Sequence, residues 1–258
     1  MTAHEIILRL EALRDDGQRL GLMRFFKTGP GQYGEGDEFL GLKVPQTREV
    51  VRAVERETPL SEVPALLASP WHEVRLCGLL LMVAKFERLA TKRLENDAEA
   101  ARQRDEILTL YLRHAERANN WDLVDMSAPR ILGHWLLLPT WLGGKELGQH
   151  RAYKHRTLDA LAESNCLWRQ RMSIVCTWWT SQAGDASWCL RYADMLVEHP
   201  HDLMHKAVGW MLREMGKRVS TDLLREFLRQ HVHQMPRTAL RYAIEKLSPD
   251  ERRYWMTL

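Results

Sequence analysis

The feature that most constrains the fold is a series of helix starts, each marked by a tryptophan, at nearly regular intervals. Comparable starts recur at Trp71, Trp121 and Trp168, which are 50 and 47 positions apart. Further helix pairs are expected to begin near Asp202 and Pro236. Apolar residues keep a helical period along the chain, and no stretch has the alternation typical of a strand. This period predicts an all-α superhelical solenoid of helical repeats.

The length of the chain fits one elongated domain or two compact ones, because 258 residues are ample for a large core. We expect a single repeat domain over residues 1–258. A solenoid of this kind curves, so it would present a long concave face suited to a rod-shaped ligand.

Charge is distributed unevenly along the chain, although the formal net charge is only +3. Residues 1–100 carry 14 Lys or Arg against 16 Asp or Glu, whereas residues 201–258 carry 11 against 7. A basic C-terminal part fits a polyanion better than an acidic partner.

The cysteines and the apolar runs predict a cytoplasmic protein. The cysteines form no CxxC pair and sit in apolar helical stretches, so we expect reduced core thiols. The acidic N-terminus is unlike a signal peptide. The longest apolar run, residues 76–84, is too short to cross a bilayer, so no membrane role is expected.

Local signals place several elements in the first half of the chain. Gly17 is expected to end the first helix, and a second helix is expected over residues 20–28. The glycine-rich stretch Gly29–Asp37 lacks a Gly-Lys-Ser/Thr ending and carries acidic residues, so it predicts a tight surface loop rather than a phosphate cradle. Ser69-Pro70 marks the start of a deeply buried helix over residues 71–90.

The stretch Asn119-Asn120-Trp121-Asp122-Leu123-Val124-Asp125 predicts a helix start with an asparagine cap. Trp121 and Asp125 are four residues apart, so an aromatic plane and a carboxylate project from one face. Pro129 should kink or restart this helix. One interpretation makes Trp121 a core residue and Asp125 a capping or ion-pairing acid. The other interpretation makes them a functional pair.

Cationic residues form three groups in the second half of the chain. Lys206, Trp210, Arg213 and Lys217 follow i, i+4, i+7 and i+11 spacing, a single stripe down one helix. This stripe is either a solvated face with Trp210 covering core, or a surface that binds nucleic-acid phosphates and a sugar or base. The second group is Arg169 and Arg171 beside Trp168, and the third is Arg237 and Arg241.

Motifs for metals and cofactors are weak. His201 and His205 share a helix face at ligand spacing, but no third ligand is in register, so we expect no metal. No nucleophile elbow, paired-carboxylate motif or dinucleotide fingerprint is present, and we expect no cofactor.

Three segments, 121–125, 168–171 and 206–214, together resemble the DNA alkylation repair family, the AlkD-like alkylpurine DNA glycosylases built from HEAT-like repeats. The resemblance spans about residues 20 to 245. It implies a HEAT-like solenoid that excises cationic N3- or N7-alkylated purines from duplex DNA without flipping the base. The implied partner is duplex DNA containing alkylated bases, with no obligate protein partner.

The resemblance also implies roles for individual residues. In the family, two tryptophans and an aspartate line the concave cleft, and an arginine supports the DNA backbone; these positions match Trp121, Trp210, Asp125 and Arg171. Well-studied members carry a tyrosine where this chain has Phe25. The alternative hypothesis is a non-catalytic helical-repeat module that binds structured DNA or a protein, which would keep the cationic stripes without needing Asp125.

Overall fold

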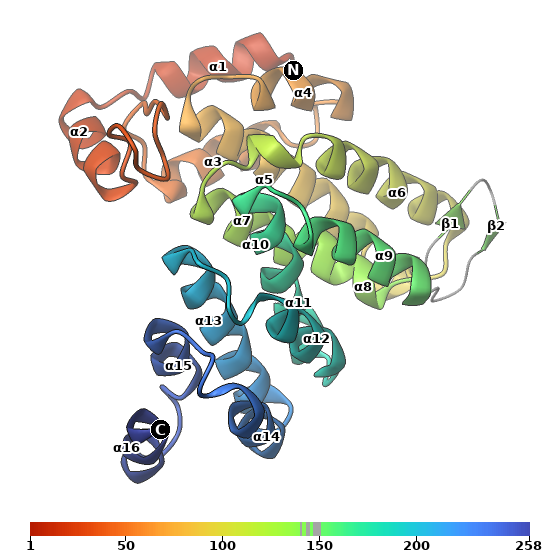
Figure 1. Ribbon diagram of the computed structural model, residues 1–258. Coiled ribbons are helices and arrows are strands. Elements are labelled where there is room, and N and C mark those ends of the chain that lie inside the picture. Colours follow the sequence, from red (N-terminus) through yellow and green to blue (C-terminus); the bar gives the residue numbers. More distant parts are fainter. Residues whose placement is uncertain (140, 143–144, 147–150) are drawn as a thin grey trace. The chain divides into compact units, whose positions relative to one another are not determined.

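The computed structural model describes residues 1–139, 141–142, 145–146 and 151–258. The prediction of an all-α, solenoid-like fold is confirmed, because helices account for nearly all the regular structure of these residues (Figure 1). The chain divides into two compact units, Met1–Ser127 with Pro139–Gly148, and Ala128–Leu138 with Gln149–Leu258. These are called unit 1 and unit 2 below. The single domain over residues 1–258 stays a prediction.

Unit 1 is built around one long buried helix. Its helices are α1 (Ala3–Glu11), α2 (Asp16–Phe25), α3 (Val44–Val54), α4 (Val63–Leu67), α5 (His72–Leu89), α6 (Ala98–Arg113) and α7 (Trp121–Ala128), with short 3₁₀ turns at Leu60–Glu62, Lys92–Leu94 and Ala115–Arg117. Helix α5 packs against α3, α4 and α6 (Figure 1). It is apolar on all sides, which is the pattern of a core helix, and Leu76, Leu79 and Met82 are at most 1% exposed.

The start of α5 lies close to where the sequence predicts it. Trp71 is the N-cap residue, and its N–H is bound by the Ser69 hydroxyl at 3.1 Å. The His72 N–H donates to the Glu38 carbonyl at 2.7 Å. The buried carboxylate of Glu73 accepts three consecutive backbone N–H groups, from residues 40, 41 and 42, at 2.8, 2.9 and 3.0 Å. The strand-like segment that follows the glycine-rich loop is therefore fastened to the first turn of α5.

Helix α2 differs from its predicted bounds at both ends. It begins at Asp16 because the Asp15 side chain caps it by accepting the Gln18 N–H at 2.9 Å. Gly17 therefore lies in the first turn of α2 and does not end α1, which stops at Glu11. Lys27, at φ 52°, turns the chain out of the helix two residues after Phe25. The predicted extension to Thr28 is wrong for this reason.

Helix α7 has the predicted start and the predicted irregularity after it. The Asn120 side-chain oxygen accepts the Trp121 N–H at 2.9 Å. Beyond α7 the chain forms a π-helical turn at Pro129–Gly133, as expected where a proline removes a donor. Helix α8 (His134–Leu137) follows. Helical periodicity does not predict the short antiparallel pair β1 (Trp141–Leu142) and β2 (Lys145–Glu146), in which Trp141 lies opposite Glu146.

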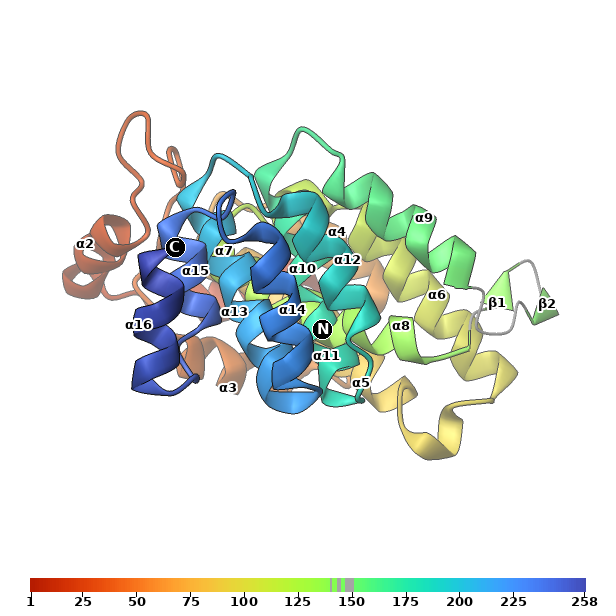
Figure 2. The same cartoon turned by 60° about the horizontal axis from the view of Figure 1, so that its bottom comes forward.

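Unit 2 is built around α13. Its helices after α8 are α9 (Arg151–Ala162), α10 (Leu167–Val175), α11 (Thr177–Gln182), α12 (Ser187–Leu196), α13 (Asp202–Arg218), α14 (Thr221–His231), α15 (Arg237–Ala243) and α16 (Pro249–Thr257). Helix α13 packs against α10, α11, α12, α14 and α15 (Figure 2). The contact with α15 is closest at Gly209, where a Cβ would lie 2.3 Å from the Ala239 carbonyl oxygen.

The helix starts predicted for this half of the chain are confirmed within a residue, at Leu167, Asp202 and Arg237. All four cysteines are free thiols, and burial raises the pKa of Cys77 and of Cys189 to about 12. Among the described residues, none of the helices combines the length and the apolar character needed to cross a bilayer.

Candidate nucleic-acid interface

The first two turns of α7 place Trp121 and Asp125 as the sequence predicts. Both residues are half-buried, whereas Val124 and, on the opposite side of the helix, Leu123 are fully buried. A half-buried indole and a half-buried carboxylate therefore share one face at the positive end of a helix. Their chemical role stays a prediction.

Trp121 is held by a group of rings from unit 1. Phe26 stacks on Trp121 with centroids 5.4 Å apart, and Phe25 meets it edge-on at 5.9 Å. Phe39 in turn stacks on Phe26 at 5.2 Å and on His72 at 4.4 Å. Phe25 is 62% exposed, whereas Phe26 and Phe39 are buried. Phe25 thus lies at the accessible edge of Trp121.

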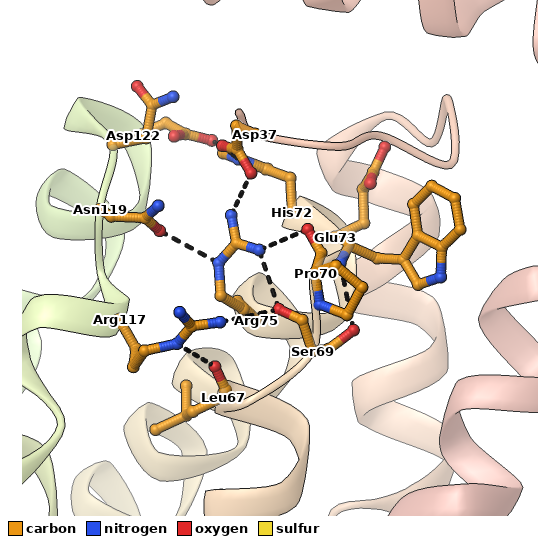
Figure 3. A network of polar contacts seen from close by, with 12 residues as sticks. Asp37, Leu67, Ser69, Pro70, His72, Glu73, Arg75, Arg117, Asn119 and Asp122 are labelled. Atoms are coloured by element: carbon orange, nitrogen blue, oxygen red, sulfur yellow. Dashed lines mark hydrogen bonds and ion pairs between the residues drawn. The ribbon is translucent and has the colours of Figure 1, made fainter. Parts of the chain in front are cut away.

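Behind these rings, His72 lies between two buried carboxylates (Figure 3). Its Nδ1 is 2.8 Å from Asp37 Oδ2 and its Nε2 is 2.9 Å from Asp122 Oδ2. Carboxylates accept hydrogen bonds, so both ring nitrogens donate and the ring is an imidazolium. Burial alone would lower the pKa of His72, but the charges and hydrogen bonds of Asp122 and Asp37 raise it to about 9.

Arg75, one turn after His72, binds the Asp37 carboxylate as well and links it to further groups (Figure 3). Its guanidinium donates to Asp37 Oδ1 and, at 3.1 Å, to Asn119 Oδ1. It also donates to the carbonyls of Ser69 and Pro70 at 3.0 and 2.7 Å. Burial alone would raise the pKa of Asp37, but the hydrogen bond and charge of His72, with the charge of Arg75, hold it below its usual range.

These five residues form what is called the clamp below: Asp37, His72, Arg75, Asn119 and Asp122. It joins the end of the glycine-rich loop to the start of α7 by two routes through α5. The loop Gly29–Asp37 is a surface loop as predicted, but Asp37 is 5% exposed and faces inward. Asp37 is therefore not one of the surface acids of this loop, because His72 and Arg75 hold its carboxylate inside the protein.

Sequence reasoning missed the clamp, although one signal was present. His72 and Arg75 are polar residues three positions apart, directly before the apolar run of residues 76–84. Such residues need buried partners, and acidic residues are the partners expected. The sequence alone does not say which of the many acidic residues these are.

In unit 2, the four residues of the predicted stripe lie on one face of α13. Lys206, Trp210 and Arg213 are half-buried and Lys217 is exposed, while the opposite face supplies core. Much of the charge is locally paired. Lys206 binds Asp202 at 2.6 Å, and Arg213 binds Glu214 at 3.1 Å and also Glu245. Lys217 has no carboxylate within ion-pair distance among the described residues.

The other predicted DNA-binding arginines fall into two classes. Arg171 is 4% exposed and donates to the Leu203 carbonyl at 2.6 Å, so it holds the start of α13. Arg169 is half-buried beside it on α10. Arg237 and Arg241 are exposed on α15, and Arg237 also donates to the Met256 carbonyl. Exposure therefore favours the α15 pair over Arg171 for contact with a polyanion.

The histidines before and within α13 bind backbone groups of this region or a neighbouring side chain. His201 caps the helix by accepting the Leu203 N–H at 3.1 Å, and His199 lies 2.9 Å from the Gln170 side-chain oxygen. His205 Nε2 lies 2.6 Å from the His199 carbonyl oxygen. Among the described residues, no three His, Cys, Asp or Glu side chains are grouped closely enough to hold a metal ion.

Comparison with known proteins adds the family to this geometry. The chain is similar in structure to a predicted DNA alkylation repair enzyme from Enterococcus faecalis, with a TM-score of 0.64 and 14% identity, covering 92% of this chain and 97% of that one. This likeness shows the fold. No curated protein matches the sequence. The sequence model described as DNA alkylation repair enzyme matches residues 6–247, nearly the whole chain. The protein therefore belongs to the DNA alkylation repair enzyme family.

Proposed function

We propose that the protein is a DNA glycosylase that releases cationic N3- and N7-alkylated purines from duplex DNA. The observation that carries the proposal is the half-buried carboxylate of Asp125, one turn from an indole that stacking fixes in place. Membership of a DNA alkylation repair family supports the substrate class.

A single carboxylate is sufficient for this reaction. Alkylation at N3 or N7 makes the purine cationic, so the base leaves as a neutral molecule and needs no general acid. Hydrolysis of ordinary glycosides differs, because it uses two carboxylates. Asp125 stabilises the oxocarbenium-like sugar by its charge and orients the attacking water. The Trp121 indole adds cation–π attraction of about 0.5–2 kcal/mol.

The residues of unit 2 bind the DNA in this proposal. Lys206, Arg213 and Lys217 meet phosphates, as do Arg237 and Arg241 on α15. Arg171 contributes mainly by holding the start of α13, and Arg169, half-buried on α10, contributes a further positive charge. Trp210, half-buried within the α13 stripe, is the second indole implied by the family resemblance. Contacts to phosphates carry no sequence information, so binding shows little sequence preference.

The test is single-turnover base release from duplex DNA containing N7-methylguanine. We expect wild-type protein to release the base and Asp125→Asn to be slower by on the order of 100-fold, because a neutral amide cannot offset positive charge on the sugar. Binding should be unchanged or slightly tighter. Asp194→Asn is the matched control, since that carboxylate is 64% exposed on α12. Its rate should equal that of wild type.

Two results would contradict the proposal. Wild-type protein that binds DNA without releasing any base would favour the non-catalytic helical-repeat module. An Asp125→Asn rate equal to wild type, in a protein with wild-type thermal stability, would remove Asp125 from the mechanism.

A further inference from the structure

The glycine-rich loop Gly29–Asp37 ends in the one residue that both arms of the clamp share. Asp37 uses one carboxylate oxygen for His72 and the other for Arg75. The His72 arm continues to Asp122, 50 positions further along the chain, and the Arg75 arm to Asn119, 44 positions further along. The two arms therefore reach α7 on both sides of its first residue, Trp121.

A second part of the loop also contacts the start of α7. At Gly34, a Cβ would lie 2.5 Å from the Phe26 carbonyl oxygen and 3.5 Å from the Asn120 side-chain nitrogen. The loop therefore folds back onto the backbone of Phe26 and onto the side chain of Asn120, the residue before Trp121. Only a glycine leaves room for this contact.

We propose that the Gly29–Asp37 loop is a positioning element, with Asp37 as its positioning residue: it completes the clamp, and the clamp fixes the first turn of α7, from which Trp121 and Asp125 project. The loop is thus a support for the candidate site and not a surface that binds phosphate.

The state of Asp122 strengthens this inference. Its Oδ2 is bound to His72, whereas its Oδ1 is buried and has no hydrogen-bond partner among the described residues. A buried carboxylate held by one partner depends on that partner, and His72 in turn depends on Asp37 for its second hydrogen bond. Removing the Asp37 charge therefore loosens Asp122 and, with it, the turn that holds Trp121.

The catalytic meaning of the clamp rests on the proposed function, so the experiment uses one readout that needs no activity. Full-length protein labelled with 5-fluorotryptophan is compared by ¹⁹F NMR as wild type, Asp37→Asn and Glu35→Gln, with the Trp121 signal assigned from Trp121→Phe. Glu35→Gln is the matched control, because Glu35 lies in the same loop, is exposed and, within the part of the chain that the structure describes, binds only the Gly31 N–H at 2.8 Å.

We expect Asp37→Asn to shift or broaden the Trp121 signal and Glu35→Gln to leave it in place. In single-turnover assays, Asp37→Asn should slow base release by on the order of 10-fold while the Kd for DNA stays close to wild type, since displaced catalytic groups lose rate more than affinity. Glu35→Gln should change neither quantity.

Asn119→Ala provides a second variant in case Asp37→Asn does not fold. It removes only the neutral end of the Arg75 arm and should shift the Trp121 signal in the same direction by a smaller amount. An unchanged Trp121 signal in folded Asp37→Asn, or in Asn119→Ala, overturns the inference. Absence of base release by wild type would contradict the proposed function alone, because the ¹⁹F signal still decides whether the loop positions Trp121.

Discussion

The start of α7 and the exposed face of α13 each present a tryptophan beside charged groups, but they are held in different ways. At α7, the charges of the clamp are buried and hold the helix from behind, while rings stack on Trp121. At α13, an apolar face supplies the support, and the charges range from the exposed Lys206–Asp202 pair to the Arg213–Glu214 pair, whose side chains are 18% and 12% exposed. Buried networks fix one geometry, whereas exposed pairs are weak and exchange partners. Under the proposed function, this difference would let unit 1 position reacting groups and unit 2 follow a DNA backbone.

The largest expected effect comes from removing the imidazolium. His72→Phe keeps a ring against Phe39 but leaves two carboxylates buried without their shared cation. It should lower the free energy of unfolding by about 3–5 kcal/mol. Lys206→Ala, which removes an ion pair whose side chains are 40% and 56% exposed, should cost less than about 1 kcal/mol.

Chemical denaturation of both variants measures this difference. Similar losses for the two substitutions would mean that the clamp behaves like a surface pair, and the contrast between the two regions would disappear.

A smaller effect is expected from pH alone. Because the pKa of His72 is raised from 6.5 to about 9, its contribution to stability is complete below pH 6.5 and is lost as pH rises through 9. The charged groups that bind it are Asp37 and Asp122, and Arg75 shares the Asp37 carboxylate with it. The stability lost across this window is roughly 3 kcal/mol.

Other groups act outside the same window. Burial lowers the pKa of His155, His199 and His201, so their effects fall below pH 6.5. The buried thiols Cys77 and Cys189, with pKa raised to about 12, lower stability mainly above pH 9. The change in the free energy of unfolding between pH 6.5 and 9, measured by urea denaturation, therefore reports the titration of His72. A stability that is flat over this range in wild type, or that falls equally in His72→Phe, would contradict the assignment.

The smallest effect is expected on the α13 side, and only on binding. Lys217→Ala should reduce the slope of log K against log salt by about 0.9, the value for one phosphate contact on B-DNA. The rate of base release at saturating protein should not change. Lys92→Ala, an exposed lysine of unit 1, serves as the matched control. An unchanged salt slope in Lys217→Ala would mean that Lys217 of the α13 stripe makes no contact with a DNA phosphate.

The parts of the fold that the sequence predicts are those with local causes. The helices that start near Trp71, Trp121 and Trp168 are observed within a residue, because caps, prolines and apolar periodicity act over a few positions. The predicted start of α2 is wrong because two local signals compete. Gly17 signals the end of a helix, but the Asp15 side chain caps a helix that begins at Asp16. Propensity alone did not decide between these two competing local signals.

The parts that could not be predicted depend on partners far apart in the chain. The placement of Trp121 and Asp125 on one helix face is predictable because they are four positions apart, but Asp37 and His72 are 35 positions apart and no periodicity relates them. The same limit explains Arg171. The sequence pattern assigns it to a cationic surface, but α10 packs against α13 and leaves Arg171 only 4% exposed. The helix face that carries the candidate site was thus predictable from the sequence, and the clamp that supports it was not.

The three amides bound by Glu73 have a consequence for how this region opens. Residues 40, 41 and 42 have no regular secondary structure, yet their N–H groups share one buried carboxylate at the start of α5. None of the three can exchange its proton with solvent without leaving that carboxylate short of a donor. The segment therefore opens as part of the cooperative unit that contains α5, and its amides exchange on the timescale of that helix and not of a loop.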